Sequence, residues 1–203
     1  MRVIAGTFRS RQLIAPKGTA TRPTSDRLRE RLFDILQTRI DGCRFADLYA
    51  GTGAAGIEAI SRSAAHVWFS ENAPAAISAL RANLSALKIV RGFTLEDRGT
   101  GALLQHLQKP GKLNAPLDLV FLDPPYEAAA EYEATLGFLG STRGSQLLAP
   151  DALVIAEHSS KDKLPIRYGA LHNIRYLKQG DAALSFYAFK SDAPEPPHLD
   201  AAQ

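Results

Sequence analysis

The chain has 203 residues, of which 45% are hydrophobic and 22% charged, and its net charge is +3; this profile is typical of one globular domain with a short appendage. It excludes a collagenous, a disordered and a disulfide-scaffold protein, because Gly and Pro are unexceptional and Cys43 is the single cysteine. No signal peptide and no apolar run near the ~20 residues of a membrane helix are visible, so we expect a cytoplasmic protein with no membrane partner.

The N-terminal segment is predicted to form a basic β-hairpin. Residues 2–5 and 11–15 have the pattern of short strands around a polar turn. Residues 1–39 hold nine basic side chains against three acidic ones, whereas the remainder holds 15 basic and 18 acidic ones. A basic arm on a mildly acidic body indicates a polyanionic partner, although a solvated surface would give the same pattern. The residues expected to contact phosphates are Arg9, Arg11 and Arg22.

A helix is predicted next, ending near Asp41-Gly42. Thr24 or Ser25 can cap its start, and the Asp26 carboxylate suits the positive end of the helix dipole. Apolar side chains then recur at helical spacing, which predicts one buried face. The members of this apolar stripe are Leu28, Leu32, Ile35, Leu36 and Ile40.

From residue 44 the pattern alternates between strands and helices. The predicted strands are compact and mostly apolar, as expected for a sheet that is covered on both faces. They span residues 45–49, 67–70, 93–95, 117–122 and 153–157. The predicted helices span residues 53–62, 74–88, 100–108 and 128–139. This alternation predicts a doubly wound α/β sheet.

The end of the chain departs from the alternation. Residues 171–178 and 183–189 are rich in β-forming side chains with a short polar connection between them, which predicts a hairpin. A mostly parallel, seven-stranded α/β sheet ending in an antiparallel hairpin is the layout of the Rossmann-like class I fold of S-adenosylmethionine-dependent methyltransferases. We therefore divide the chain into an N-terminal extension (1–41), a Rossmann-like domain (42–190) and a tail (191–203) whose composition predicts disorder.

A glycine-rich loop follows the first strand of this domain. Gly51, Gly53 and Gly56 match G-x-G-x-x-G, in which glycine lets the backbone turn sharply and approach a ligand. Nicotinamide and flavin enzymes share the pattern, and a tight turn without a ligand also produces it. The loop residues expected to contact a cofactor are Tyr49, Ala50, Gly51, Thr52, Gly53 and Gly56.

Two acidic residues distinguish the cofactor classes. Glu71 ends the second strand, 20 positions after Gly51, where a carboxylate can accept hydrogen bonds from ribose hydroxyls in either class. Asp47 lies four residues before Gly51 and can pair with a cationic group. S-adenosylmethionine carries an ammonium group, whereas a dinucleotide would bring a pyrophosphate that Asp47 repels. The pattern therefore favours S-adenosylmethionine.

The fourth strand leads directly into Asp123-Pro124-Pro125-Tyr126, at the edge of the sheet where ligands bind. An exocyclic purine amine is a poor nucleophile because its lone pair is delocalised into the ring. The Asp123 carboxylate and the Pro124 carbonyl can accept its two hydrogens, and consecutive prolines hold that carbonyl rigidly. Tyr126 offers a ring for the base to stack on. A Pro-rich turn with an ordinary packed Tyr is the alternative, but its place after the fourth strand favours the catalytic interpretation.

With these motifs, the sequence resembles the RsmD family, bacterial enzymes that methylate guanine N2 in 16S ribosomal RNA. The likeness extends to about residue 190. The segments that carry it are residues 1–13, 22–30, 50–56, 71–72, 121–126, 178–181 and 184–187.

The resemblance implies a methyltransferase that uses S-adenosylmethionine and modifies N2 of the guanine at position 966 of 16S rRNA, in assembled 30S subunits. It implies that residues 22–30 line the cofactor and RNA side, with Thr24 and Asn72 among the cofactor contacts. The family's adenine-contacting acid corresponds to Asp97, with Thr100 as the alternative because the local spacing differs. No metal is expected, and a monomer is the default expectation.

Other functions share parts of this pattern. The same loop chemistry would serve adenine N6 in DNA, another RNA, or a glutamine amide in a protein. The basic hairpin argues against a protein acceptor, and the lack of a sizeable target-recognition insertion argues against DNA. Asp47 disfavours a nicotinamide oxidoreductase, and an intact cofactor pocket makes a catalytically silent RNA-binding module unnecessary. The five histidines show no metal-ligand spacing.

Overall fold

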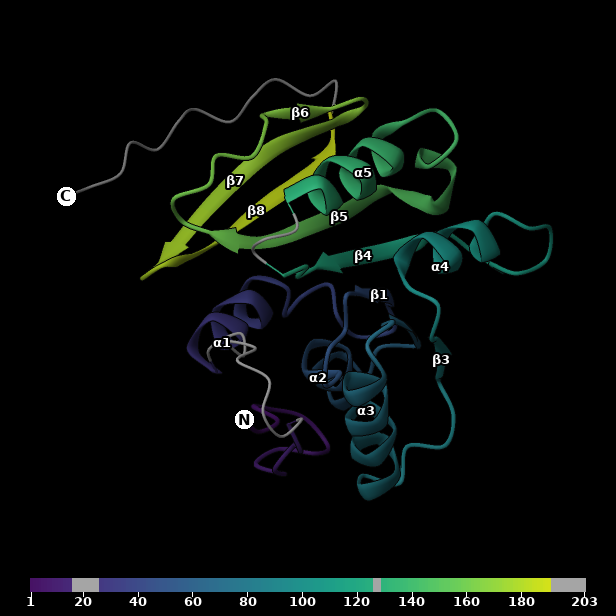
Figure 1. Ribbon diagram of the computed structural model, residues 1–203, viewed down its shortest axis with the longest axis vertical. Helices are drawn as coiled ribbons and strands as arrows, with labels where there is room; N and C mark the ends of the chain where they lie inside the picture. Colours follow the sequence, from purple (N-terminus) through teal and green to yellow (C-terminus); the bar gives the residue numbers. More distant parts are fainter. Residues whose placement is uncertain (16–25, 126–128, 191–203) are drawn as a thin grey trace.

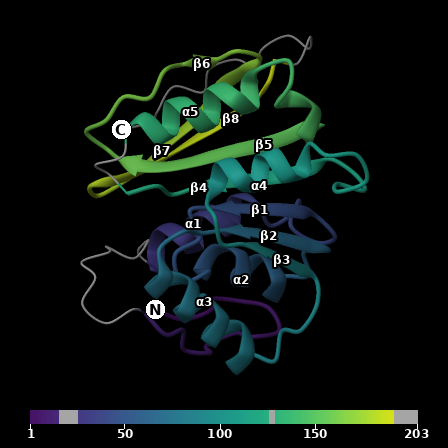
Figure 2. The ribbon, with the colours of Figure 1, turned by 45° about the vertical axis from the view of Figure 1, so that its right-hand side comes forward.

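The computed structural model describes residues 1–15, 26–125 and 129–190. Eight strands form one sheet in the order β3-β2-β1-β4-β5-β8-β7-β6 (Figure 2). Strands β1 to β5 are mutually parallel, and β6, β7 and β8 pair antiparallel. The strands are β1 (Arg44–Leu48), β2 (His66–Ser70), β3 (Phe93–Glu96), β4 (Leu117–Leu122), β5 (Leu148–Ser159), β6 (Arg167–Tyr168), β7 (Leu171–Gln179) and β8 (Ala182–Phe189).

Helices cover both faces of this sheet. They are α1 (Asp26–Ile35), α2 (Ala54–Ser61), α3 (Pro74–Ala86), α4 (Thr100–Leu107) and α5 (Ala129–Gly140) (Figure 1). Helices α1, α2 and α3 bury their apolar side chains in one core, and α4 and α5 bury theirs in a second. Successive strand residues alternate between the cores, as Phe45 and Ala46 do. The predicted doubly wound α/β class is therefore confirmed.

The strand register brings the predicted motifs to one edge of the sheet. Leu48 at the end of β1 pairs with Leu122 at the end of β4, and Leu122 pairs in turn with Ala156 of β5. The loops after β1, β2 and β4 consequently leave the sheet on the same side, which we call the carboxyl edge. None of the helices in the described ranges is long and apolar enough to span a membrane.

Several elements differ from those expected from the sequence, three of them in ways that affect the architecture. The sheet has eight strands and not seven, because the two-residue β6 pairs with β7 and is too short to leave a periodic pattern. Helix α1 ends at Ile35, although Leu36 and Ile40 beyond it remain buried in turns and so prolong the apolar stripe. The N-terminal hairpin is reduced to a single bridge between Arg2 and Gln12.

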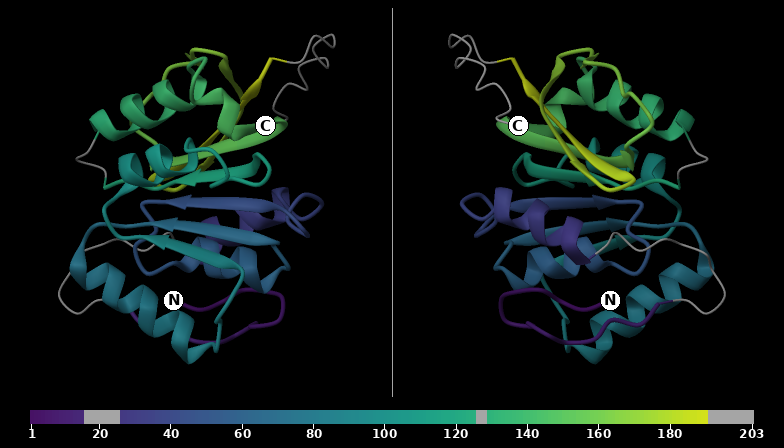
Figure 3. Two further views of the ribbon diagram at one scale, coloured as in Figure 1. Left: turned by 90° about the vertical axis from the view of Figure 1, so that its right-hand side faces the viewer. Right: turned by 90° about the vertical axis from the view of Figure 1, so that its left-hand side faces the viewer.

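The N-terminal residues pack against the domain. The fully buried Glu58 carboxylate on α2 accepts hydrogen bonds from the amides of Ile4 and Ala5, at 2.7 and 3.0 Å. Asn83 on α3 accepts one from the Ile14 amide at 2.7 Å and donates to the Ile14 carbonyl. The segment therefore follows α2 and α3 (Figure 3), and the predicted boundary near residue 41 stays a prediction.

Candidate active site

The glycine loop between β1 and α2 uses its glycines in different ways. Gly51 and Gly53 have φ angles of +56° and +79°, in the left-handed region. A Cβ on Gly51 would meet no atom within 4 Å, so its backbone borders open space that a ligand can approach. A Cβ on Gly56 would lie 2.2 Å from the Phe69 ring, so this glycine lets α2 pack closely on β2.

Asp47 is buried beneath this loop, with 2% of its surface exposed. Its carboxylate accepts a hydrogen bond from the Gly56 amide at 2.8 Å, which ties β1 to the first turn of α2. Burial above all, together with the charges of Asp123 and Glu71, raises the pKa of Asp47 to about 7. The charges of Asp123 and Glu71 both disfavour ionisation of Asp47, and a bound cation would offset this effect.

Glu71 follows β2 and also contacts the glycine loop. One carboxylate oxygen accepts a hydrogen bond from the Gly51 amide at 2.8 Å. The other accepts bonds from the amides of Asn72 and Ala73, each at 2.8 Å, immediately before α3. The acid predicted 20 positions after Gly51 thus lies beside that glycine.

Asp123 begins the loop after β4. Its amide donates to the Leu48 carbonyl at 3.4 Å, so its backbone lies beside the end of β1. Asp123 is half-buried, Pro124 is buried and Pro125 is exposed. Pro124 is therefore held in the protein while the loop reaches the surface, which restrains the backbone at this edge. Tyr126 lies outside the described residues.

Tyr49 connects the glycine loop to the helix that follows Asp123. It adopts φ +66° although it is not glycine. Its phenol donates to a Glu131 carboxylate oxygen at 2.7 Å and lies 2.7 Å from the Thr135 hydroxyl, both on α5. Burial is the main cause that raises the pKa of Tyr49 to about 12, so the phenol stays protonated near neutral pH. No motif marked Glu131 or Thr135 in the sequence.

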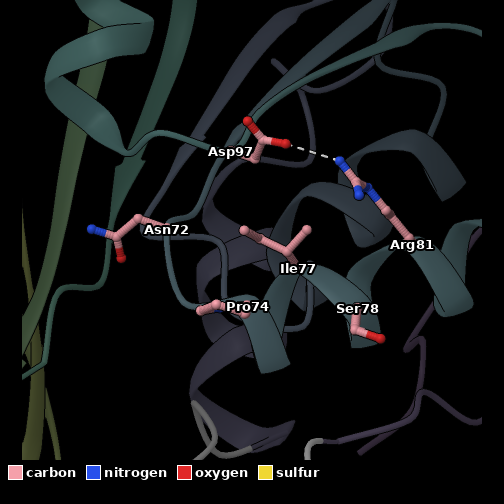
Figure 4. Close-up of a pocket in the computed structure, with 6 residues that line it drawn as sticks. All are labelled: Asn72, Pro74, Ile77, Ser78, Arg81 and Asp97. Atoms are coloured by element: carbon pink, nitrogen blue, oxygen red, sulfur yellow. Dashed lines mark hydrogen bonds and ion pairs between the residues drawn. The ribbon is translucent and has the colours of Figure 1, made fainter.

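A cavity of about 410 Å³ opens next to the Glu71 segment (Figure 4). It is lined by Asn72, Pro74, Ile77, Ser78, Arg81 and Asp97. Asp97 forms an ion pair of 3.0 Å with Arg81 on the cavity wall. Thr100 is instead buried at the start of α4, where it accepts a hydrogen bond from Ser70 at 3.3 Å. Of the two candidate adenine contacts, Asp97 lines the cavity.

The basic residues of the N-terminal segment lie elsewhere. The Arg11 guanidinium reaches the Ala86 carbonyl at the end of α3, and the Thr7 amide bonds the Ser61 carbonyl at the end of α2. Both helices start at the carboxyl edge and run to the opposite edge, so this turn, including the exposed Arg9, lies far from Asp123 in the fold. The predicted contacts Arg22 and Thr24 fall outside the described residues.

Two structural residues were missed because nothing local marks them. Glu58 and Asn83 lie inside ordinary helical patterns, yet both hold the N-terminal segment, and Asn83 also donates to the Thr52 carbonyl at 3.0 Å. These partners in the N-terminal segment and the glycine loop are more than 30 residues away in sequence, which no periodicity can reveal. Within the described residues, no cluster of three His, Cys, Asp or Glu side chains is arranged to hold a metal ion.

A doubly wound sheet with a glycine loop after β1, an acid after β2 and Asp-Pro-Pro after β4 defines the class I methyltransferase fold. The chain belongs to the RsmD family, the family described as Conserved hypothetical protein 95, which matches residues 1–188. This match covers the N-terminal segment as well as the sheet.

Individual relatives agree with this assignment. Ribosomal RNA small subunit methyltransferase D of Escherichia coli K12 is 33% identical over 165 residues, which are 81% of this chain and 78% of the relative. The relative named as rRNA methyltransferase YlbH, of Bacillus subtilis 168, is 33% identical over 187 residues, 92% of this chain and 98% of YlbH. The solved structure of YhhF from Escherichia coli superposes with a TM-score of 0.77 at 31% identity, covering 94% of this chain and 98% of YhhF.

Proposed function

We propose that this protein transfers the methyl group of S-adenosylmethionine to the exocyclic N2 amine of a guanine in 16S rRNA. The observation that carries the proposal is the glycine loop that holds Asp47 and Glu71 through its amides, with Gly51 bordering open space and the Asp123 backbone beside the end of β1. Three carboxylates suit a cationic ligand and would repel a pyrophosphate. The names of the Escherichia coli and Bacillus subtilis relatives support rRNA as the acceptor.

The glycine loop and the acids around it would hold the cofactor, which supplies an electrophilic methyl group when bound. Glu71 would accept hydrogen bonds from the ribose hydroxyls, and Asp47 would pair with the ammonium group through its ionised form. Asp97 and Asn72, which line the adjacent cavity, are the proposed adenine contacts. Tyr49, Ala50, Thr52 and Gly53 would border the cofactor through the loop backbone.

Asp123 and Pro124 would prepare the acceptor. The Asp123 carboxylate and the Pro124 carbonyl accept the two hydrogens of the amine, which localises its lone pair and points it at the methyl group. Pro125 restricts the backbone so that these acceptors need no reorganisation during the reaction. Tyr126 would stack on the guanine, a contact worth ~1–3 kcal/mol. No strong base is required because the proton can leave late.

We further propose that the acceptor is guanine 966 in an assembled 30S subunit. The chain has little surface for reading a sequence in free RNA, since it has 203 residues and only a small N-terminal arm beside the sheet and its covering helices. An RNA segment whose conformation is already fixed by ribosomal proteins would lose less conformational entropy when the enzyme binds the guanine.

The test is transfer of labelled methyl from S-adenosylmethionine to 30S subunits that lack this modification, with naked 16S rRNA and duplex DNA in parallel. Label at N2 of one guanine in 30S RNA would support reaction, acceptor and atom together. Equal rates on naked 16S rRNA would contradict the preference for assembled subunits. Label in DNA alone would replace the acceptor with adenine N6, and no label in any substrate would contradict the cofactor assignment.

A further inference from the structure

We infer that the RNA backbone beside the target base is held by a lysine rim on the β5–β6 loop and the β7–β8 hairpin, formed by Lys161, Lys163 and Lys178. The inference rests on the proposed function and names a contact surface that the N-terminal arginines do not provide. All three lysines are exposed. No ion pair between described residues involves any of them.

The register places this rim at the same edge as Asp123. Leu122 of β4 pairs with Ala156 of β5, so His158 stands level with Pro124. Ala183 of β8 pairs with both His158 and Lys178. Lys178 is therefore three strand spacings from Pro124, about 14 Å, which a strand of a few nucleotides can span. Figure 1 shows the arrowheads of β4, β5 and β7 pointing to the same side.

Buried contacts hold the two lysine-bearing segments together. The His158 ring, with 1% of its surface exposed, lies 2.9 Å from the Ser185 hydroxyl and 2.8 Å from the Ser159 carbonyl. Next to it, the Ser160 amide and hydroxyl donate to the carbonyls of Asp181 and Gly180, at 2.8 and 3.2 Å. These hydrogen bonds join the start of the β5–β6 loop to the β7–β8 turn, so the two lysine-bearing segments lie side by side.

An exposed aromatic ring lies on β7, two residues before Lys178. Tyr176 pairs with Ser185 across β7 and β8, so its side chain is on the same face as those of His158 and Lys178. Half of its surface is exposed, and its ring centroid lies 6.1 Å from that of His158. An exposed ring beside a cation suits unpaired nucleotides, whose bases stack on the ring while their phosphates contact lysines.

The rim is local and not a broad basic face. Asp162 and Asp181 lie in the same two segments and are exposed. The expected contact is therefore with a few phosphates at defined positions, the kind that fixes register and orientation without reading sequence. The cofactor side of the edge, over β1 and β2, is acidic, so the charge difference would direct the RNA toward the β5–β7 side.

The test compares two triple variants of the full-length protein that each remove three cations. The rim variant is Lys161→Gln, Lys163→Gln, Lys178→Gln. The matched control is Arg91→Gln, Lys109→Gln, Lys112→Gln, whose side chains are exposed at the opposite edge of the sheet. Binding of naked 16S rRNA is measured by titration over a range of salt concentrations, and methyl transfer is measured at saturating S-adenosylmethionine.

For the rim variant we expect Kd and KM for RNA to rise about tenfold, while kcat and cofactor affinity stay near wild type. The slope of log K for RNA binding against log salt concentration should decrease in magnitude by about 2, because each of the three lost phosphate contacts contributes ~0.7. The control should match wild type. Tyr176→Ala should weaken RNA binding several-fold, and Tyr176→Phe should restore it because the ring is retained.

Equal RNA binding by the rim and control variants would overturn the inference. If the rim variant lost binding only to assembled 30S subunits and bound naked rRNA as the wild type does, the inference would also be overturned. The rim would then contact a ribosomal protein instead of RNA. RNA binding is read separately from methyl transfer. A failure of the proposed reaction, with no methyl transfer by the wild type, would therefore remain distinguishable from a failure of the rim.

Discussion

The phenol of Tyr49 donates a hydrogen bond of 2.7 Å to the Glu131 carboxylate. Tyr49 belongs to the glycine loop, and Glu131 lies in the first turns of α5, just after the loop that begins at Asp123. One side chain therefore connects the proposed cofactor loop with the proposed base-binding loop. The left-handed backbone of Tyr49, which costs on the order of 1 kcal/mol, is maintained by this contact and by Thr135.

Replacing Tyr49 by Phe should lower kcat about three- to tenfold while leaving the affinity for S-adenosylmethionine within about twofold. The ring still fills its place, but a hydrogen bond to a charged group, worth roughly 1.5–3 kcal/mol, no longer positions α5 and its preceding loop. Steady-state kinetics with rRNA and cofactor titration separate these effects. The control, Thr94→Val, removes the 2.9 Å contact with His66 away from the site. An equal loss of kcat in both variants would contradict a positioning role for Tyr49.

Alanine at Gly51 and at Gly56 should have opposite consequences. At Gly51 the new methyl enters open space, so cofactor affinity should fall at least tenfold while stability drops by only about 1 kcal/mol for the left-handed φ. At Gly56 the methyl would overlap the Phe69 ring, so the free energy of unfolding should fall by about 1–3 kcal/mol or more. Calorimetric titration and denaturant unfolding of both variants test this contrast, and the reverse order of effects would refute it.

The raised pKa of Asp47, about 7, predicts two pH dependences. Burial favours the protonated carboxyl in the free protein, so this residue contributes stability that is fully present below its ordinary pKa of 3.8 and is lost as pH rises through about 7. Cofactor binding should run the other way, since only the ionised form attracts an ammonium group. Affinity for S-adenosylmethionine should therefore increase from pH 6 to 8, with proton release on binding near pH 7.

Asp47→Asn is the control for both effects. It keeps an oxygen that can accept the Gly56 hydrogen bond but cannot ionise. Its affinity for the cofactor should be lower and nearly independent of pH in this range, and unfolding midpoints should vary less with pH than in the wild type. If the wild type and the variant show the same pH profile, another group is responsible.

Asp123→Ala should reduce turnover by at least ~100-fold while cofactor binding persists. The change removes an acceptor that positions and polarises the amine, and preorganised acceptors of this kind contribute about two to three orders of magnitude in rate. Single-turnover methyl transfer and cofactor titration measure the two properties on one preparation. Joint loss of binding and turnover would instead assign Asp123 a structural role.

Short-range patterns were sufficient for the fold class and for the two principal loops. A strand, a helix or a glycine loop is encoded within a few consecutive residues, so periodicity and residue type predicted the alternating sheet, the loop at Gly51–Gly56 and the turn at Asp123. The short strand β6 was not predicted, because its two residues, Arg167 and Tyr168, form a strand only by pairing with β7.

The sequence by itself determined the fold class and the residues that we propose to carry the chemistry; the tertiary structure decided which of them lie beside one another. Nothing in the chain near Tyr49 indicates Glu131, 82 positions away, and nothing near Arg11 indicates that it lies against the end of α3 rather than beside Asp123. The phosphate contacts of the basic N-terminal segment were predicted from its charge alone, and charge does not specify where a segment lies in the fold. Only tertiary contacts decided these positions: the strand register places Lys178 level with Pro124, and hydrogen bonds to the ends of α2 and α3 place the arginine-bearing turn at the opposite edge. Position depends on hydrogen-bonded pairing between segments that are distant in the sequence.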